Sequence, residues 1–88
     1  MSDPVAWIVI ERGWEVVSSD GEKVGTVDEV LGDQNADIFG GLAVVPGLLK
    51  KPKYAPAERV GEIFEGRVML ELTKTEFDGL AEHEGNSV

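Results

Sequence analysis

An Asp-Gly pair flanked by apolar, β-branched residues is the feature that most constrains this fold. It lies in the stretch SDGEKVGTV, residues 19–27. Asp-Gly is typical of tight hairpin turns because glycine adopts positive φ angles without steric cost. The stretch lacks the other glycines of a dinucleotide-binding fingerprint and the Gly-Lys-Ser/Thr of a phosphate-binding loop. The sequence therefore predicts the corner of a small β-structure here, not a phosphate or metal loop.

The second arm of this hairpin has two interpretations, because its apolar residues recur at helical spacing. These residues are Val24, Val27, Val30 and Leu31. Gly25 and Thr26 disfavour a helix, and a bulge at Gly25 would bend a strand and shift the phase of its inward-facing residues. We therefore expect a bent strand over residues 24–31.

Further strands are predicted along the chain, about six in all. They are expected at residues 5–10, 14–17, 38–45 and 54–60, and around a hairpin turn at Glu65–Gly66. The first of these has helix-start signals in Asp3 and Pro4, but a helix apolar on every side would need a larger core than this chain provides. The glycine pair 40–41 indicates a second bulge or a close backbone approach, and Pro56 confines its strand to a sheet edge.

The pattern changes after residue 72. Thr73 and Glu76 form a capping box, and Leu72 and Phe77 occupy the positions of a hydrophobic staple. A short helix is expected over residues 74–82, with an apolar stripe that closes an open end of the barrel. That stripe consists of Phe77, Leu80 and Ala81.

A chain of 88 residues has room for one small core. It contains no cysteine, so neither disulfides nor thiolate metal sites supplement that core. We expect a single domain over residues 1–82, followed by a flexible tail over residues 83–88. The predicted fold class is all-β: a small, mostly antiparallel β-barrel with a short C-terminal helix.

The charge balance is strongly acidic. Eight Lys+Arg against seventeen Asp+Glu give a formal net charge of -9. Such a charge repels nucleic-acid phosphates and anionic lipid surfaces, so neither is expected as a partner. The longest apolar run, residues 5–10, is shorter than a membrane span, and no basic leader segment precedes it. We expect a cytoplasmic protein.

The chain offers few residues for catalysis or metal binding. Asp33, Asn35 and Asp37 match the first ligand positions of a calcium loop, but the glycine and glutamate that such a loop needs are replaced by Ile38 and Val44. Weak divalent-ion binding over residues 33–37 is the alternative that stays open, and no metal or other cofactor is expected.

The remaining candidate groups are also expected to be non-catalytic. The single histidine, His83, lies in the predicted tail, and Ser18 and Ser19 are interpreted as turn formers. Trp7 and Trp14 are interpreted as core residues whose indole N–H groups reach the surface. The alternative is a ligand-binding or enzymatic barrel that uses carboxylates and a tryptophan at its mouth, recognisable by a pocket between both tryptophans and two carboxylates.

Three motifs together resemble the PRC-barrel family over about residues 11–82. They are Gly-x-x-Val followed by Asp-Gly-x-x-Val-Gly-x-Val (residues 13–27), the apolar strand GGLAVVPG, and Pro-Ala-x-x-Val (residues 56–60). The resemblance implies a small, mostly antiparallel barrel that contacts other proteins, as in the H subunit of photosynthetic reaction centres and in a ribosome-maturation factor. It implies a non-catalytic interaction or assembly module, and the specific roles of those two proteins are not carried over.

The loop PGLLKKPKY is the candidate interaction site. Its two adjacent leucines point in opposite directions in an extended chain, so one of them is expected at the surface inside a cationic rim. Such a patch suits docking of an acidic protein surface, including a second copy of this chain. The alternative is a solvated loop. The candidate residues are Leu48, Leu49, Lys50, Lys51, Lys53 and Tyr54.

Overall fold

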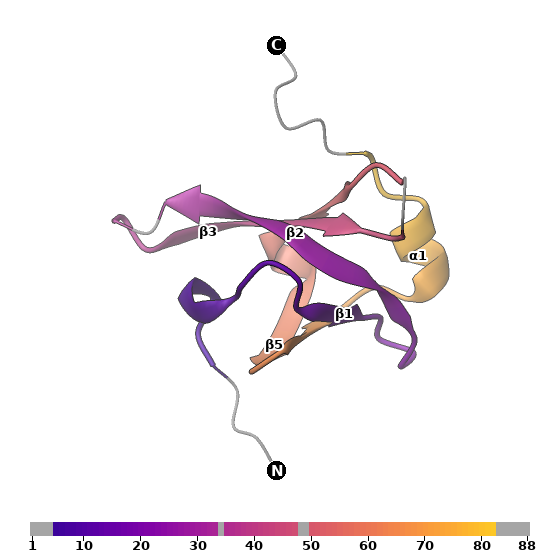
Figure 1. Cartoon of the computed structure of the whole chain (residues 1–88), viewed down its shortest axis with the longest axis horizontal. Coiled ribbons are helices and arrows are strands. Elements are labelled where there is room, and N and C mark those ends of the chain that lie inside the picture. Colours follow the sequence, from indigo (N-terminus) through magenta and orange to yellow (C-terminus); the bar gives the residue numbers. More distant parts are fainter. Residues whose placement is uncertain (1–4, 34, 48–49, 83–88) are drawn as a thin grey trace.

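A computed structural model of the chain describes residues 5–33, 35–47 and 50–82. Within these residues one six-stranded sheet curves around the core, in the order β4-β3-β2-β1-β6-β5 (Figure 1). The strands are β1 (Glu15–Val17), β2 (Lys23–Asp33), β3 (Ile38–Val45), β4 (Lys53–Pro56), β5 (Val60–Phe64) and β6 (Arg67–Leu70). The helical elements are the 3₁₀ turns η1 (Trp7–Val9) and η2 (Ala57–Arg59) and the α-helix α1 (Lys74–Asp78).

The strands are mostly antiparallel, with one parallel pair between β1 and β6. The all-β prediction with a short C-terminal helix is therefore confirmed. The expected closure of the ring by hydrogen bonds is not found in the described part of the chain, since β4 and β5 are the ends of the sheet. The turn η2 joins these two strands instead, and it interrupts the single strand expected over residues 54–60.

The Asp-Gly turn has the predicted place between β1 and β2. Gly21 has a φ of 85°, and its N–H donates to the carbonyl of Ser18 at 3.0 Å. The Ser18 N–H in turn donates to the carbonyl of Glu22 at 2.8 Å, which closes a loop of three residues. Glycine relieves the strain of the positive φ at the last of these three residues.

Bulges explain why the apolar residues of β2 recur every three positions although β2 is a strand. Val24 has no partner in the pairing with β1, and Asp28 has none in the pairing with β3. Each additional residue shifts the phase, so that Val24, Val27 and Val30 all contribute to the core. The prediction of a bulged strand over residues 24–31 is confirmed, but the unpaired residue is Val24 instead of the predicted Gly25, which pairs with Val16. Figure 1 shows β2 running across the whole molecule.

A further bulge lies in β3, which is one of the two alternatives predicted from the glycine pair. Leu31 pairs with Gly41 and Gly32 pairs with Phe39, which leaves Gly40 without a partner in the ladder. The bulge puts Phe39 on the core side, together with the buried residues 42 and 44.

The prediction of a strand over residues 5–10 is wrong, because residues 7–9 form η1. The reason is that Trp7 and Ile10 both pack against the core. Residues three apart point to the same side of a 3₁₀ turn but to opposite sides of a strand. The turn therefore buries both anchors and leaves the two residues between them, Ile8 and Val9, exposed.

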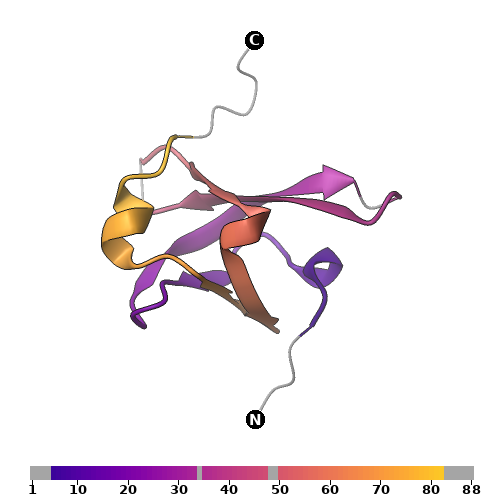
Figure 2. The same cartoon turned by 180° about the vertical axis from the view of Figure 1, so that it is seen from behind.

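The helix α1 begins as predicted. Thr73 and Glu76 form both hydrogen bonds of the capping box, and Phe77 is only 1% exposed in the core. The helix ends at Asp78, earlier than expected, and Gly79 caps it. Figure 2 shows α1 on the side of the molecule away from the far end of the β2–β3 hairpin. Within the described residues, no helix is long and apolar enough to cross a membrane.

Each edge of the sheet is hydrogen-bonded by a segment from near one chain end. The Val5 N–H donates to the carbonyl of Ile63 in β5 at 2.7 Å. On the other edge, the Tyr54 N–H in β4 donates to the carbonyl of Ala81 at 3.0 Å. These bonds occupy backbone groups that an edge strand would otherwise present to other chains.

Gly25 is one of the positions where the backbone of β3 lies too close to β2 for a side chain, and it supplies a test of the fold. A Cβ at Gly25 would fall on the backbone carbonyl of Val45, so Gly25→Ala should lower the free energy of unfolding by about 1–3 kcal/mol. Gly79→Ala is the control, since its Cβ would meet no heavy atom closer than 3.6 Å and its φ of -86° suits any residue. We expect that control to stay within about 0.5 kcal/mol of the unmodified chain in urea unfolding followed by circular dichroism. Equal midpoints for the two variants would contradict the close approach.

Candidate interaction surface

The turn η1 is fixed at both ends. Before it, Val5 bonds to β5, and after it Ile10 is buried in the core. Trp7 stacks on Phe39 of β3 with ring centroids 5.1 Å apart and an interplanar angle of 16°. The indole N–H of Trp7 donates to Oδ1 of Asp37 at 3.3 Å. These contacts hold η1 against the start of β3, as Figure 1 shows.

Both of these segments carry exposed large apolar side chains. Ile8 and Val9 of η1 are 46% and 45% exposed, and Ile38 at the start of β3 is 59% exposed. They are the exposed large hydrophobic residues of the described chain. Single exposed apolar residues are ordinary. Ile38 is such a single residue, because it precedes the core-facing Phe39 in β3 and successive side chains of a strand point to opposite faces. Ile8 and Val9 are adjacent on η1, and this pair indicates a surface suited to contact with another molecule.

A hollow of about 240 Å³ adjoins η1. The turn between β5 and β6 reaches it because the Glu15 N–H donates to the carbonyl of Gly66 at 3.0 Å, which brings that turn beside Trp14. We call this space the η1 hollow, and the hollow together with Ile8 the η1 surface. The residues that line the hollow are Val5, Val9, Glu11, Trp14 and Glu65.

The η1 hollow contains one tryptophan and two carboxylates, which is close to the arrangement expected for a ligand-binding barrel. The second tryptophan of that expected arrangement, Trp7, does not line the hollow. Its ring stacks on Phe39, and its N–H donates to Asp37. Both tryptophans are half-buried and pack against the core, as predicted.

The sequence-predicted interaction loop is only partly described. Leu48 and Leu49 lie outside the described residues. Lys50 and Lys51 are exposed and line an open hollow of about 370 Å³ together with Asp78 and Glu82, among others. The apolar centre proposed for this patch therefore stays a prediction.

The other two residues of that loop have contacts within the fold. The Lys53 ammonium donates to the carbonyls of Asp78 at 3.0 Å and Leu80 at 3.2 Å, where a cation is favourable at the end of α1. The Tyr54 hydroxyl donates to the carbonyl of Gly40 at 2.6 Å. Both side chains thus help to hold β4 against its neighbours.

The carboxylates of the predicted calcium-like loop also have partners within the protein. Oδ1 of Asp33 accepts from the N–H groups of Asn35 and Ala36 at 2.9 and 3.3 Å, and Asp37 accepts from Trp7. In the described part of the chain, no group of three potential metal-ligating side chains is found. The expectation that calcium does not bind stays a prediction.

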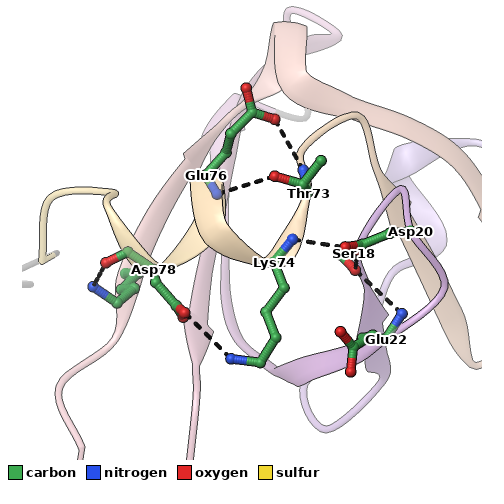
Figure 3. A network of polar contacts seen from close by, with 8 residues as sticks. Ser18, Asp20, Glu22, Thr73, Lys74, Glu76 and Asp78 are labelled. Atoms are coloured by element: carbon green, nitrogen blue, oxygen red, sulfur yellow. Dashed lines mark hydrogen bonds and ion pairs between the residues drawn. The ribbon is translucent and has the colours of Figure 1, made fainter.

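Ser18 and Asp20 join the β1–β2 hairpin to α1 (Figure 3). The buried Ser18 hydroxyl donates to Asp20 and accepts from the Glu22 N–H, as expected for a turn-forming serine. Oδ1 of Asp20 also accepts from the Lys74 N–H at 3.3 Å, in the first turn of the helix. The Ser18 hydrogen bond, more than any other contact, lowers the pKa of the Asp20 carboxyl, and the Lys74 N–H and ammonium act in the same direction. Asp20 is therefore a structural carboxylate that is ionised at neutral pH.

Sequence reasoning missed the η1 surface. One signal was present: residues 5 and 7–10 are apolar at both odd and even positions, so a strand with one buried face would leave some of them exposed. The contact with Phe39 and the approach of the Glu65 turn had no sequence signal, because both depend on distant pairing.

The described residues form one small, bulged and mostly antiparallel sheet that is open between β4 and β5, with the 3₁₀ turn η2 connecting these two strands along the chain. The PRC-barrel domain model matches residues 12–77, which is more than half of the chain. The chain therefore belongs to the PRC-barrel family, as its motifs predicted. The comparison with curated proteins gives no match. The turn η1 precedes the matched region, and of the residues that form the η1 surface only Trp14 and Glu65 lie inside it.

The lowered pKa of Asp20 predicts how stability depends on pH. Because the folded-state pKa lies below the unfolded-state value, the contribution of Asp20 is present at neutral pH and is lost below about pH 4 as the carboxylate is protonated. Asp20→Asn should be less stable than the unmodified chain at pH 7, and the difference should shrink toward pH 3. Urea unfolding across this pH range measures it. Glu22→Gln removes the same charge nearby and should show no such convergence; identical profiles for both variants would contradict the assignment.

Proposed function

We propose that this chain is a non-catalytic protein-interaction module of the PRC-barrel type, and that the η1 surface is its contact region. The main support for this proposal is that Ile8 and Val9 are exposed on a turn that is fixed at both ends by burial and hydrogen bonds. A contact that is already ordered loses little conformational entropy on binding. Burial of exposed aliphatic side chains then supplies the main favourable free energy.

The non-catalytic part of the proposal is supported by polar side chains that form hydrogen bonds within the protein. The Ser18 hydroxyl is buried in its turn, and Asp20 receives N–H and O–H donors that hold it ionised. A general base or nucleophile must instead be within reach of a substrate. The partner is a second protein or a second copy of this chain.

The alternative is a small-ligand or enzymatic barrel. It is favoured by one observation, the presence of Trp14 with Glu11 and Glu65 around the η1 hollow. Its volume of about 240 Å³ lies below the range of about 300–1,000 Å³ typical of small-molecule pockets. That comparison favours a surface that receives a side chain of a protein over one that encloses a substrate.

Replacing Ile8 and Val9 by serine tests the proposed contact. The double variant should keep the fold, since both side chains are half-exposed, and it should lose binding of a specific partner, or self-association, by about tenfold or more. Quantitative co-capture from lysate and sedimentation across concentration are the measurements. Lys50→Ser/Lys51→Ser is the comparison, because it alters the exposed part of the loop that sequence reasoning favoured.

The two variants separate the competing surfaces. If only Ile8→Ser/Val9→Ser loses partner binding, the result supports the η1 surface as the contact region. Loss only with the loop variant would move the interface to residues 47–54. An unchanged set of partners and an unchanged oligomeric state with both variants would contradict the proposal.

A further inference from the structure

We propose that the η1 hollow receives a lysine or arginine side chain of the partner, flanked in the partner's sequence by apolar residues. This inference rests on the proposed function and adds the chemistry of the partner. The hollow combines two aliphatic side chains, Val5 and Val9, with the aromatic Trp14 and the carboxylates of Glu11 and Glu65. These groups match the two parts of a long basic side chain, an apolar stem and a charged end.

The electrostatics of the hollow select a cation. An indole face attracts a positive charge through its quadrupole, and two nearby carboxylates add to that attraction. Within the described residues, neither Glu11 nor Glu65 takes part in an ion pair. The basic residues closest to them in sequence, Arg12 and Arg67, contact Asp28 at 3.4 Å and Glu15 at 3.2 Å instead.

The flanking residues of the partner follow from what surrounds the hollow. Ile8 is exposed beside Val9 on η1, so a segment that places its basic residue in the hollow can rest apolar neighbours on Ile8. The net charge of -9 adds a long-range attraction for a basic segment and repels an acidic one.

A peptide titration tests this assignment. The probe is an acetylated and amidated isoleucine–lysine–isoleucine tripeptide, followed through the indole N–H resonance of ¹⁵N-labelled Trp14. Trp7 is the internal reference, since its N–H is bonded to Asp37. The lysine peptide should shift the Trp14 signal saturably at millimolar concentrations, and the norleucine analogue should bind about fivefold more weakly.

Charge-removing variants show whether the preference comes from the hollow. Glu11→Gln/Glu65→Gln should remove the preference for lysine over norleucine. Glu22→Gln/Glu58→Gln removes the same net charge at exposed positions that do not line the hollow and should keep it. Raising the salt concentration should weaken binding of the lysine peptide and leave binding of the norleucine analogue unchanged.

Several results would overturn the inference: no saturable Trp14 shift with the lysine peptide, equal binding of the two peptides, or a preference that survives Glu11→Gln/Glu65→Gln. Binding of n-butylammonium as tight as that of the lysine peptide would also overturn it, because it would indicate a site for a small cation. A further outcome is that Ile8→Ser/Val9→Ser abolishes partner binding in a chain that shows no preference for lysine over norleucine. That result would support the η1 surface as the contact region and contradict only the inference that it receives a basic side chain.

Discussion

The close approach of β2 and β3 is the constraint on which the rest of this structure depends. Three bulges, at Val24 and Asp28 in β2 and at Gly40 in β3, let one long hairpin bend around the core while its apolar residues keep facing inward. The bend carries the far end of the hairpin toward the N-terminal segment. Phe39 thereby becomes the platform for Trp7, and the position of η1 follows from it.

Features that depend on residues close in sequence were predictable. The Asp-Gly turn and the capping box of α1 are formed by side-chain and backbone groups at most a few residues apart, so their residue types alone specify them. The bent strand was predictable for a related reason: Gly25 interrupted an otherwise helical pattern. The family resemblance rested on the same turn and bulge residues.

Features that depend on distant residues were not predictable. The segment before residue 10 has strand-forming residues, and its 3₁₀ turn is specified by contacts with Phe39 and Asp37, some thirty positions away. Lys53 resembled part of a cationic patch, and its role is set by the end of α1, whose position depends on how the sheet curves. The η1 surface combines residues 5–14 with Glu65, two separate segments of the chain, so no local sequence pattern predicted it.

Backbone hydrogen bonds join Val5 to β5 and Ala81 to β4, so residues outside the six strands also contact both edges of the sheet. Removal of either segment would uncover backbone donors and acceptors on an edge strand, which is the geometry that recruits a strand from another molecule. The boundaries chosen for expression, or the placement of a fusion partner, therefore affect more than solubility. Truncation that removes Val5 would free the Ile63 carbonyl, and truncation that removes Ala81 would free the Tyr54 N–H, for pairing with the edge of another copy.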